Sequence, residues 1–150
     1  LHYPFLDAVT GPQERPRHPS DIPLEMMEMF VEIYSDINLR TSPTVSPVMA
    51  APIQLKDTAS TLIITAENDA LRADGKKYSE LLESAEVKVK HLCMANAHHG
   101  YIEDWYNKEI YSSTPYDKKR THDDKFGEAA EKAINISLNF LKEQFGNKQT

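Results

Sequence analysis

The sequence predicts an α/β fold, as part of a doubly wound, mostly parallel sheet with helices on both of its faces. Apolar runs at 61–66 and 87–94 are rich in β-forming residues and are bounded by polar residues, as strands are. A segment with helical periodicity lies between these runs, and strands that alternate with helices pair in parallel. A third strand-like segment at 1–7 precedes them. Three strands make up part of a doubly wound sheet, but not a whole one.

The first segment, residues 1–7, holds aromatic and apolar residues typical of a strand, in which Pro4 limits the hydrogen bonds that the backbone donates. Prolines and a glycine then predict a loop. Ser20 or Asp21 can cap the helix that follows, with Pro23 in its first turn.

Apolar residues recur at helical spacing between Leu24 and Tyr34, and several of them are methionines. Packing in the core is one explanation for these methionines. The other is that they line a pocket, since flexible thioethers suit variable apolar ligands. Ser42-Pro43 and Ser46-Pro47 predict turns before a short apolar segment at 48–53.

The run at 61–66 predicts a strand that is buried on both faces. Asp74 or Gly75 begins the next helix, and its buried face is expected to comprise Tyr78, Leu81, Leu82 and Ala85. In the run at 87–94, Val and Lys alternate before the segment turns apolar, which predicts a last strand with one face partly in water. Cys93 in this strand is expected to be buried as a small apolar residue.

Residues 102–120 lack a regular pattern, which predicts an irregular stretch longer than the usual loop, with room for a short helical turn. Asp123 or Asp124 caps a final helix, and Gly146 lies where its C-terminal cap belongs. The expected buried stripe of this helix comprises Ala130, Ala133, Ile134, Leu138, Leu141 and Phe145.

Composition excludes several classes of protein. The chain has 150 residues, a net charge of −6 and a pI near 5.5, which argue against nucleic acid or an anionic membrane as a partner. The only basic cluster, 118–120, is flanked by aspartates. No apolar run is long enough to span a bilayer. Cys93 is the only cysteine, so neither an internal disulfide nor a cysteine-based zinc site is expected. The sequence shows no signal-peptide pattern, and we expect a cytoplasmic protein.

Two motifs resemble the acid and histidine motifs of the α/β-hydrolase fold, and in particular those of the hormone-sensitive-lipase-like esterases. They are Ile64-Thr-Ala-Glu-Asn-Asp-Ala-Leu-Arg-Ala-Asp-Gly75 and His99-Gly100-Tyr101. Tyr3-Pro-Phe-Leu-Asp7, Ser46-Pro-Val-Met-Ala50 and the closing helix fit the same family in the expected order. One departure is Ala70, where the family usually has proline. The resemblance covers most of this chain but only the second half of the family's domain, so residues 1–150 are interpreted as the C-terminal portion of one catalytic domain.

The resemblance implies that Asp69 is the carboxylate and His99 the base of a Ser-His-Asp triad. In such a triad the buried carboxylate fixes the tautomer of the imidazole that takes the proton of the serine. By position alone, Asp69 could instead be a turn residue that caps the next helix. Glu67 is the alternative acid. Asp74 is expected to cap its helix and brace the loop of Asp69.

His98 lies next to His99, and only one of them can face the site if the backbone is extended there. We interpret His98 as a loop histidine without a role. A metal site would recruit His91, His98, His99 and Asp104, but their spacing matches no usual ligand pattern, so neither a metal nor another cofactor is expected.

The nucleophile is missing. None of the five glycines belongs to a Gly-x-Ser-x-Gly elbow, and the sequence has no His-Gly-Gly oxyanion motif. The leading hypothesis is therefore a carboxylic-ester hydrolase that acts on small acyl or acetyl esters, in which this chain supplies Asp69 and His99. A preceding segment or a second chain would carry the serine and pack along residues 1–7. The alternatives are a non-catalytic α/β fragment that serves as an interaction module, and a small flavodoxin-like domain, which the lack of a glycine-rich phosphate loop disfavours.

Overall fold

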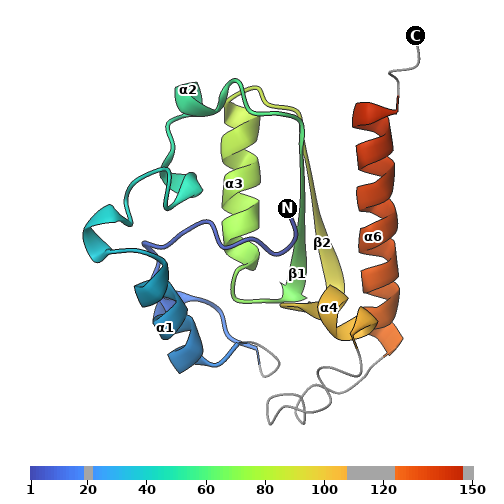
Figure 1. Cartoon of the computed structure of the whole chain (residues 1–150), viewed down its shortest axis with the longest axis horizontal. Helices are drawn as coiled ribbons and strands as arrows, with labels where there is room; N and C mark the ends of the chain where they lie inside the picture. Colours follow the sequence, from blue (N-terminus) through green and yellow to red (C-terminus); the bar gives the residue numbers. More distant parts are fainter. Residues whose placement is uncertain (19–21, 108–123, 147–150) are drawn as a thin grey trace.

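A computed structural model describes residues 1–18, 22–107 and 124–146 of the chain (Figure 1). The expected caps Ser20, Asp21 and Asp123 and the basic cluster 118–120 lie outside the described residues. The described helices and strands are η1 (Pro12–Glu14), α1 (Leu24–Tyr34), η2 (Ile37–Leu39), η3 (Pro47–Met49), α2 (Pro52–Leu55), β1 (Thr61–Asn68), α3 (Arg72–Ser84), β2 (Val89–His98), α4 (Tyr101–Tyr106) and α6 (Asp124–Phe145).

Strands β1 and β2 pair in parallel, from Thr61 opposite Val89 to Asn68 opposite His98. The first residues of the chain lie along the other edge of β1. Their contacts are a single bridge from His2 to Ile64 and hydrogen bonds from Tyr3 N to Ile64 O (2.7 Å) and from Ile64 N to Leu1 O (2.8 Å).

Residues 1–7 therefore do not form the predicted third strand, and the described sheet has two strands. At Tyr3 the backbone has φ 31°, a conformation that strands do not adopt, and Pro4 has no N–H to donate. These two residues turn the chain away from β1 after one bridge. The predicted parallel pairing is nevertheless present in that bridge.

Strand β2 contains a bulge near its end. The pairing passes from Ala66–Met94 to Asn68–His98, so β2 holds more residues than β1 over the same length. Asn96 accommodates the extra chain with φ 59°, in the left-handed region that asparagine tolerates. Its N–H donates to the carboxylate of Glu67 at 2.8 Å.

Helices cover both faces of the sheet, as predicted: α3 lies on one face and α6 on the other (Figure 1). The core under α3 comprises Ile63, Leu82, Ala85 and Val87, and the core under α6 includes Leu62, Ile64, Ala66, Met94, Ala129, Ala130 and Ala133. Helix α3 approaches β1 closely at Gly75, where an added Cβ would lie 2.4 Å from Cγ2 of Thr65. Glycine is required there because any side chain would push the helix off the strand.

Three local expectations are wrong. Helix α3 begins at Arg72, so Asp74 lies within its first turn and does not cap it. Pro23 is the N-cap residue of α1 and precedes the first turn. Cys93 is exposed. Helix α3 approaches the sheet at Thr65 of β1, and it does not cover Cys93, the residue of β2 that pairs with Thr65.

The buried stripe of α6 is also only partly as expected. Ala130 and Ala133 are fully buried, whereas Leu138 and Leu141 are each 49% exposed and Phe145 is 70% exposed. The small side chains of the alanines allow α6 to approach the sheet closely, and Ile136 and Phe140 continue that face. Leu138, Leu141 and Phe145 therefore point away from the sheet. No described helix is both long and apolar enough to cross a membrane.

Candidate functional site

Asp69 and His99 lie side by side at the carboxyl ends of β1 and β2. Asp69 directly follows β1 and His99 directly follows β2, and the parallel pairing brings these two ends together. The distance from Nδ1 of His99 to Oδ2 of Asp69 is 3.1 Å. The Asp69 side chain is completely buried and the His99 side chain is 25% exposed. The strand–helix–strand pattern thus correctly predicted that the two residues meet.

The carboxylate of Asp69 has a second partner. Its Oδ1 accepts a hydrogen bond from the backbone N–H of Leu71 at 2.8 Å, which is an Asx turn leading into α3. The sequence leaves open whether Asp69 is a turn residue or the carboxylate of a triad, and in the structure the same side chain makes both the Asx turn and the contact with His99. Because one oxygen is bound by the backbone, the other is fixed in direction toward His99.

The contact also determines what the imidazole can do. A carboxylate only accepts, so Nδ1 of His99 carries the proton and donates it to Asp69. Nε2 is then the unprotonated nitrogen of the neutral ring, and it can take a proton from a hydroxyl group.

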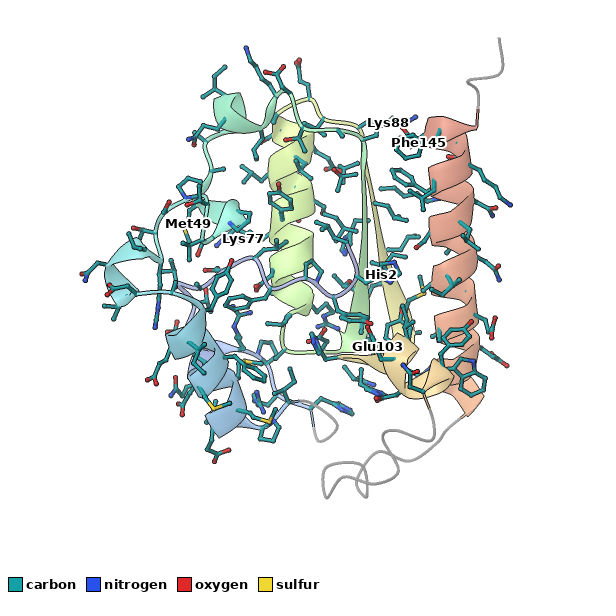
Figure 2. All side chains as sticks on the ribbon, viewed as in Figure 1. His2, Met49, Lys77, Lys88, Glu103 and Phe145 are labelled. Atoms are coloured by element: carbon teal, nitrogen blue, oxygen red, sulfur yellow. The ribbon has the colours of Figure 1, made fainter. Side chains whose placement is uncertain are left out.

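Tyr3 packs against the same imidazole. The two ring centroids are 5.0 Å apart with the planes at 64°, an edge-to-face contact. The Tyr3 hydroxyl donates to the carboxylate of Glu103, a residue of α4. Burial, followed by the contact with Glu103, raises the pKa of Tyr3, so its hydroxyl stays protonated and remains a donor. Figure 2 shows Glu103 at the end of the sheet where β1 and β2 finish.

His98 is not the loop histidine that the sequence suggested. It is the last residue of β2, and its Nε2 lies 2.6 Å from Oδ2 of Asp104, with each of the two side chains only 7% exposed. Sequence reasoning missed this pair because Asp104 belongs to a stretch without regular pattern. The sequence does place a histidine and an aspartate on either side of Gly100, a residue that permits a tight turn, and this pattern could have indicated the pair.

Asp74 holds together two distant segments. Its Oδ2 accepts from the backbone N–H groups of Leu6 and Asp7, each at 3.0 Å, and its Oδ1 lies 2.5 Å from Nη1 of Arg15. Nη2 of Arg15 donates to the carbonyl of Asp7 at 2.5 Å. Burial raises the pKa of the Asp74 carboxyl group, and Arg15 opposes that rise. Asp74 therefore braces residues 6–7 against α3, the helix that follows the loop of Asp69.

The remaining candidates lie elsewhere. The Glu67 carboxylate binds Asn96 N–H on the bulge of β2. Nε2 of His91 lies 3.0 Å from the hydroxyl of Thr65. Within the part of the chain that the structure describes, no three His, Cys, Asp or Glu side chains are grouped as a metal would need.

An apolar pocket of about 530 Å³ opens beside His99. Its wall is formed mainly by one face of α1, with the N-terminal segment and Leu71 completing it, and among its described lining residues only His99 and two tyrosines are ionisable. The lining residues are Tyr3, Phe5, Ile22, Met27, Phe30, Val31, Ile33, Tyr34, Leu71 and His99. Both explanations for the α1 methionines hold at Met27, which is 3% exposed and also lines the pocket.

Comparison with known proteins identifies the family of this chain. A family model described as alpha/beta hydrolase fold matches residues 1–103. The vegetative-specific protein H5 of Dictyostelium discoideum is 40% identical over 63 residues, which are 42% of this chain and 19% of that protein.

Solved structures show the same likeness. A thermostable esterase from Pseudomonas putida ECU1011 is 31% identical with a TM-score of 0.62, over 67% of this chain and 33% of the esterase. Brefeldin A esterase, a bacterial homologue of human hormone-sensitive lipase, shares the fold at 23% identity and a TM-score of 0.52, over 75% of this chain and 30% of that one. The chain spans about a third or less of the length of each of these proteins.

Proposed function

Because this chain belongs to the α/β-hydrolase fold family, we propose that it supplies the acid and the histidine of a serine carboxylic-ester hydrolase of the hormone-sensitive-lipase-like group. The observation that carries the proposal is the hydrogen bond from Nδ1 of His99 to the buried carboxylate of Asp69. A histidine oriented in this way at the carboxyl end of a parallel sheet is the proton-transfer half of a triad.

The chemistry follows from this orientation. Nε2 of His99 takes the proton from a serine hydroxyl while the serine oxygen attacks the ester carbonyl. The imidazolium then gives the proton to the departing alcohol oxygen, and an acyl-serine remains. Water completes the reaction: His99 takes one proton from it while the water oxygen attacks the acyl carbonyl, the acyl–oxygen bond to serine then breaks, the serine oxygen recovers its proton from His99, and the carboxylic acid leaves. Asp69 holds the tautomer and stabilises the imidazolium throughout.

The serine comes from a segment outside these 150 residues, since the sequence has no Gly-x-Ser-x-Gly elbow. In this fold the nucleophile precedes the acid and the histidine in the chain. The match covers 33% of the Pseudomonas putida esterase, so most of that protein lies outside the part that this chain resembles. We therefore place residues 1–150 in the C-terminal portion of one catalytic domain, next to a segment or a chain that carries the serine.

The substrate class is argued from the pocket. Apart from His99 and two tyrosines the lining residues that the structure describes are apolar, and none of these is an Arg or Lys that could bind a carboxylate. An uncharged acyl or alcohol group fits it, which favours small acyl or acetyl esters. No organic cofactor enters this chemistry, and we expect a chelator to leave activity unchanged, because the described residues hold no metal-ligand cluster.

The test uses the full-length protein and a series of p-nitrophenyl esters. Asp69→Asn and His99→Ala are each expected to lower kcat by roughly 10³-fold or more, because the base loses its tautomer or is removed. His91→Ala is the matched control. It removes a histidine of β2, the strand that His99 follows, and this histidine contacts Thr65. The variant should retain activity. A wild-type full-length protein without ester hydrolysis would favour the interaction-module hypothesis. Full activity of His99→Ala would show that another base acts.

A further inference from the structure

We propose that helix α4 positions His99 through a second, buried histidine–carboxylate pair formed by His98 and Asp104. These two are positioning residues, since neither lines the pocket beside His99. The inference rests on the proposed function of Asp69 and His99, and it adds a structural reason for the precision of their contact.

The pair is short and well shielded from water. Nε2 of His98 donates to Oδ2 of Asp104 at 2.6 Å, and both side chains are 7% exposed. A hydrogen bond to an ionised acceptor is stronger than one between neutral groups, and burial in a low-dielectric surrounding strengthens it further. The contact can therefore resist the motion of a short turn.

The pair spans the turn that carries His99. His98 lies immediately before His99, and Asp104 lies on the first turn of α4, just after Gly100. The backbone N–H of Asp104 also donates to the carbonyl of Gly100 at 3.0 Å. Asp104 thus holds the chain on both sides of His99, by its carboxylate at one end and by its backbone at the other.

This turn needs such a support. Gly100 has φ 77°, and glycine moves between backbone conformations more easily than any other residue. Rotation at Gly100 would displace His99 from Asp69, whose own direction is fixed by Leu71. Misplacement of a catalytic group by about 1 Å can cost roughly a hundredfold in rate.

Helix α4 also holds His99 from its other side. Glu103, the residue before Asp104, accepts the hydrogen bond of Tyr3, and the centroid of the Tyr3 ring lies 5.0 Å from that of the His99 imidazole, in an edge-to-face contact. Two consecutive acidic residues of one short helix therefore support the turn that carries His99 and, through Tyr3, its imidazole ring.

The experiment measures the orientation of His99 directly. In the full-length protein with ¹⁵N-labelled histidine, the Nδ1 proton of His99 that is shared with Asp69 gives a downfield NMR resonance, which is assigned by its loss in His99→Gln. We expect Asp104→Ala to broaden or remove this resonance. Asp104→Asn should retain it, because the amide oxygen still accepts from His98. His91→Asn, in β2, is the control and should also retain the resonance.

Kinetics provide the second readout. Asp104→Ala should lower kcat by roughly 10- to 100-fold while KM changes little, since the pair positions the base and does not bind substrate. Circular dichroism establishes that the variant is folded. If Asp104→Ala does not fold, the double variant His98→Leu/Asp104→Leu replaces the pair with apolar volume, and it should show the same loss of the resonance.

An unchanged His99 resonance in a folded variant that lacks the pair would overturn the inference, whatever happens to kcat. The NMR measurement does not depend on hydrolysis. A full-length protein without esterase activity would therefore refute the proposed function, and the resonance would still decide whether Asp104 orients His99.

Discussion

The guanidinium of Arg15 lies 2.5 Å from the carboxylate of Asp74, and the two side chains are 2% and 4% exposed. Removal of the cation would leave the buried carboxylate with its backbone hydrogen bonds but without an opposite charge. We expect Arg15→Met to lower the free energy of unfolding by about 3–5 kcal/mol, the usual cost of breaking a buried ion pair.

Lys77→Met is the matched control for Arg15→Met. The Lys77 side chain is 52% exposed where it reaches Asp7, so its loss should cost about 1 kcal/mol or less. Urea denaturation of both variants measures the difference. Equal losses of unfolding free energy in the two variants would mean that burial does not make the Arg15–Asp74 ion pair more stabilising than the exposed one.

The size of the pocket should determine substrate choice. Val31 is 5% exposed and lines the pocket, so Val31→Phe fills part of it. We expect kcat/KM to fall for esters with long acyl or alcohol groups, on the order of tenfold for each methylene excluded, and to change little for acetyl esters.

The control is Ile53→Phe, which enlarges a residue that is 70% exposed and lies outside the pocket. Its substrate profile should match that of the wild-type protein. A uniform loss across all esters in Val31→Phe would argue against this pocket as the substrate site.

His91 should make stability depend on pH. Burial lowers the pKa of His91 below its ordinary value of 6.5, and Lys76 lowers it further, against the opposing charges of Glu80 and Glu83. The unfolded chain therefore takes up a proton at higher pH than the folded one, and the free energy of unfolding falls as the pH drops below 6.5.

The His91→Asn variant should show a shallower fall in stability below pH 6.5, measured by urea denaturation at several pH values. Some dependence should remain, because burial also lowers the pKa of His2. An unchanged slope would show that His91 titrates alike in the folded and unfolded chain.

Tyr101 carries an unsatisfied polar group. The residue is fully buried, and its hydroxyl has no hydrogen-bond partner within the described part of the chain. Tyr101→Phe removes the buried hydroxyl, and we expect the free energy of unfolding to stay the same or rise by about 1 kcal/mol. Tyr3→Phe makes the same chemical change where the hydroxyl binds Glu103, and it should destabilise the protein. Thermal unfolding of the two variants tests whether the effects differ in sign.

The central part of the fold and the meeting of two site residues could be predicted from the sequence. The run at 61–66 carries a strong local signal, and a parallel pair of strands leaves few positions for the residues that follow them. Asp69 and His99 therefore met as expected, although their catalytic roles stay a prediction.

Features that depend on tertiary contacts could not be predicted. Cys93 is exposed because α3 covers β1 at that level and not β2. The face that α6 turns toward the sheet is set by its alanines, which fit closely there. The His98–Asp104 pair depends on a turn at Gly100, and nothing in the periodicity of that stretch specifies how the chain folds back.

The bulge at Asn96 makes the site sensitive to the length of the chain as well as to its residue types. Side chains alternate along a strand, so a shift of one residue exchanges their environments. Loss of one residue between Met94 and His98 would move His99 toward the buried position beside Asp104, and gain of one would move His98 to the position beside Asp69. Related proteins that share this arrangement should therefore tolerate substitutions in the stretch more readily than insertions or deletions.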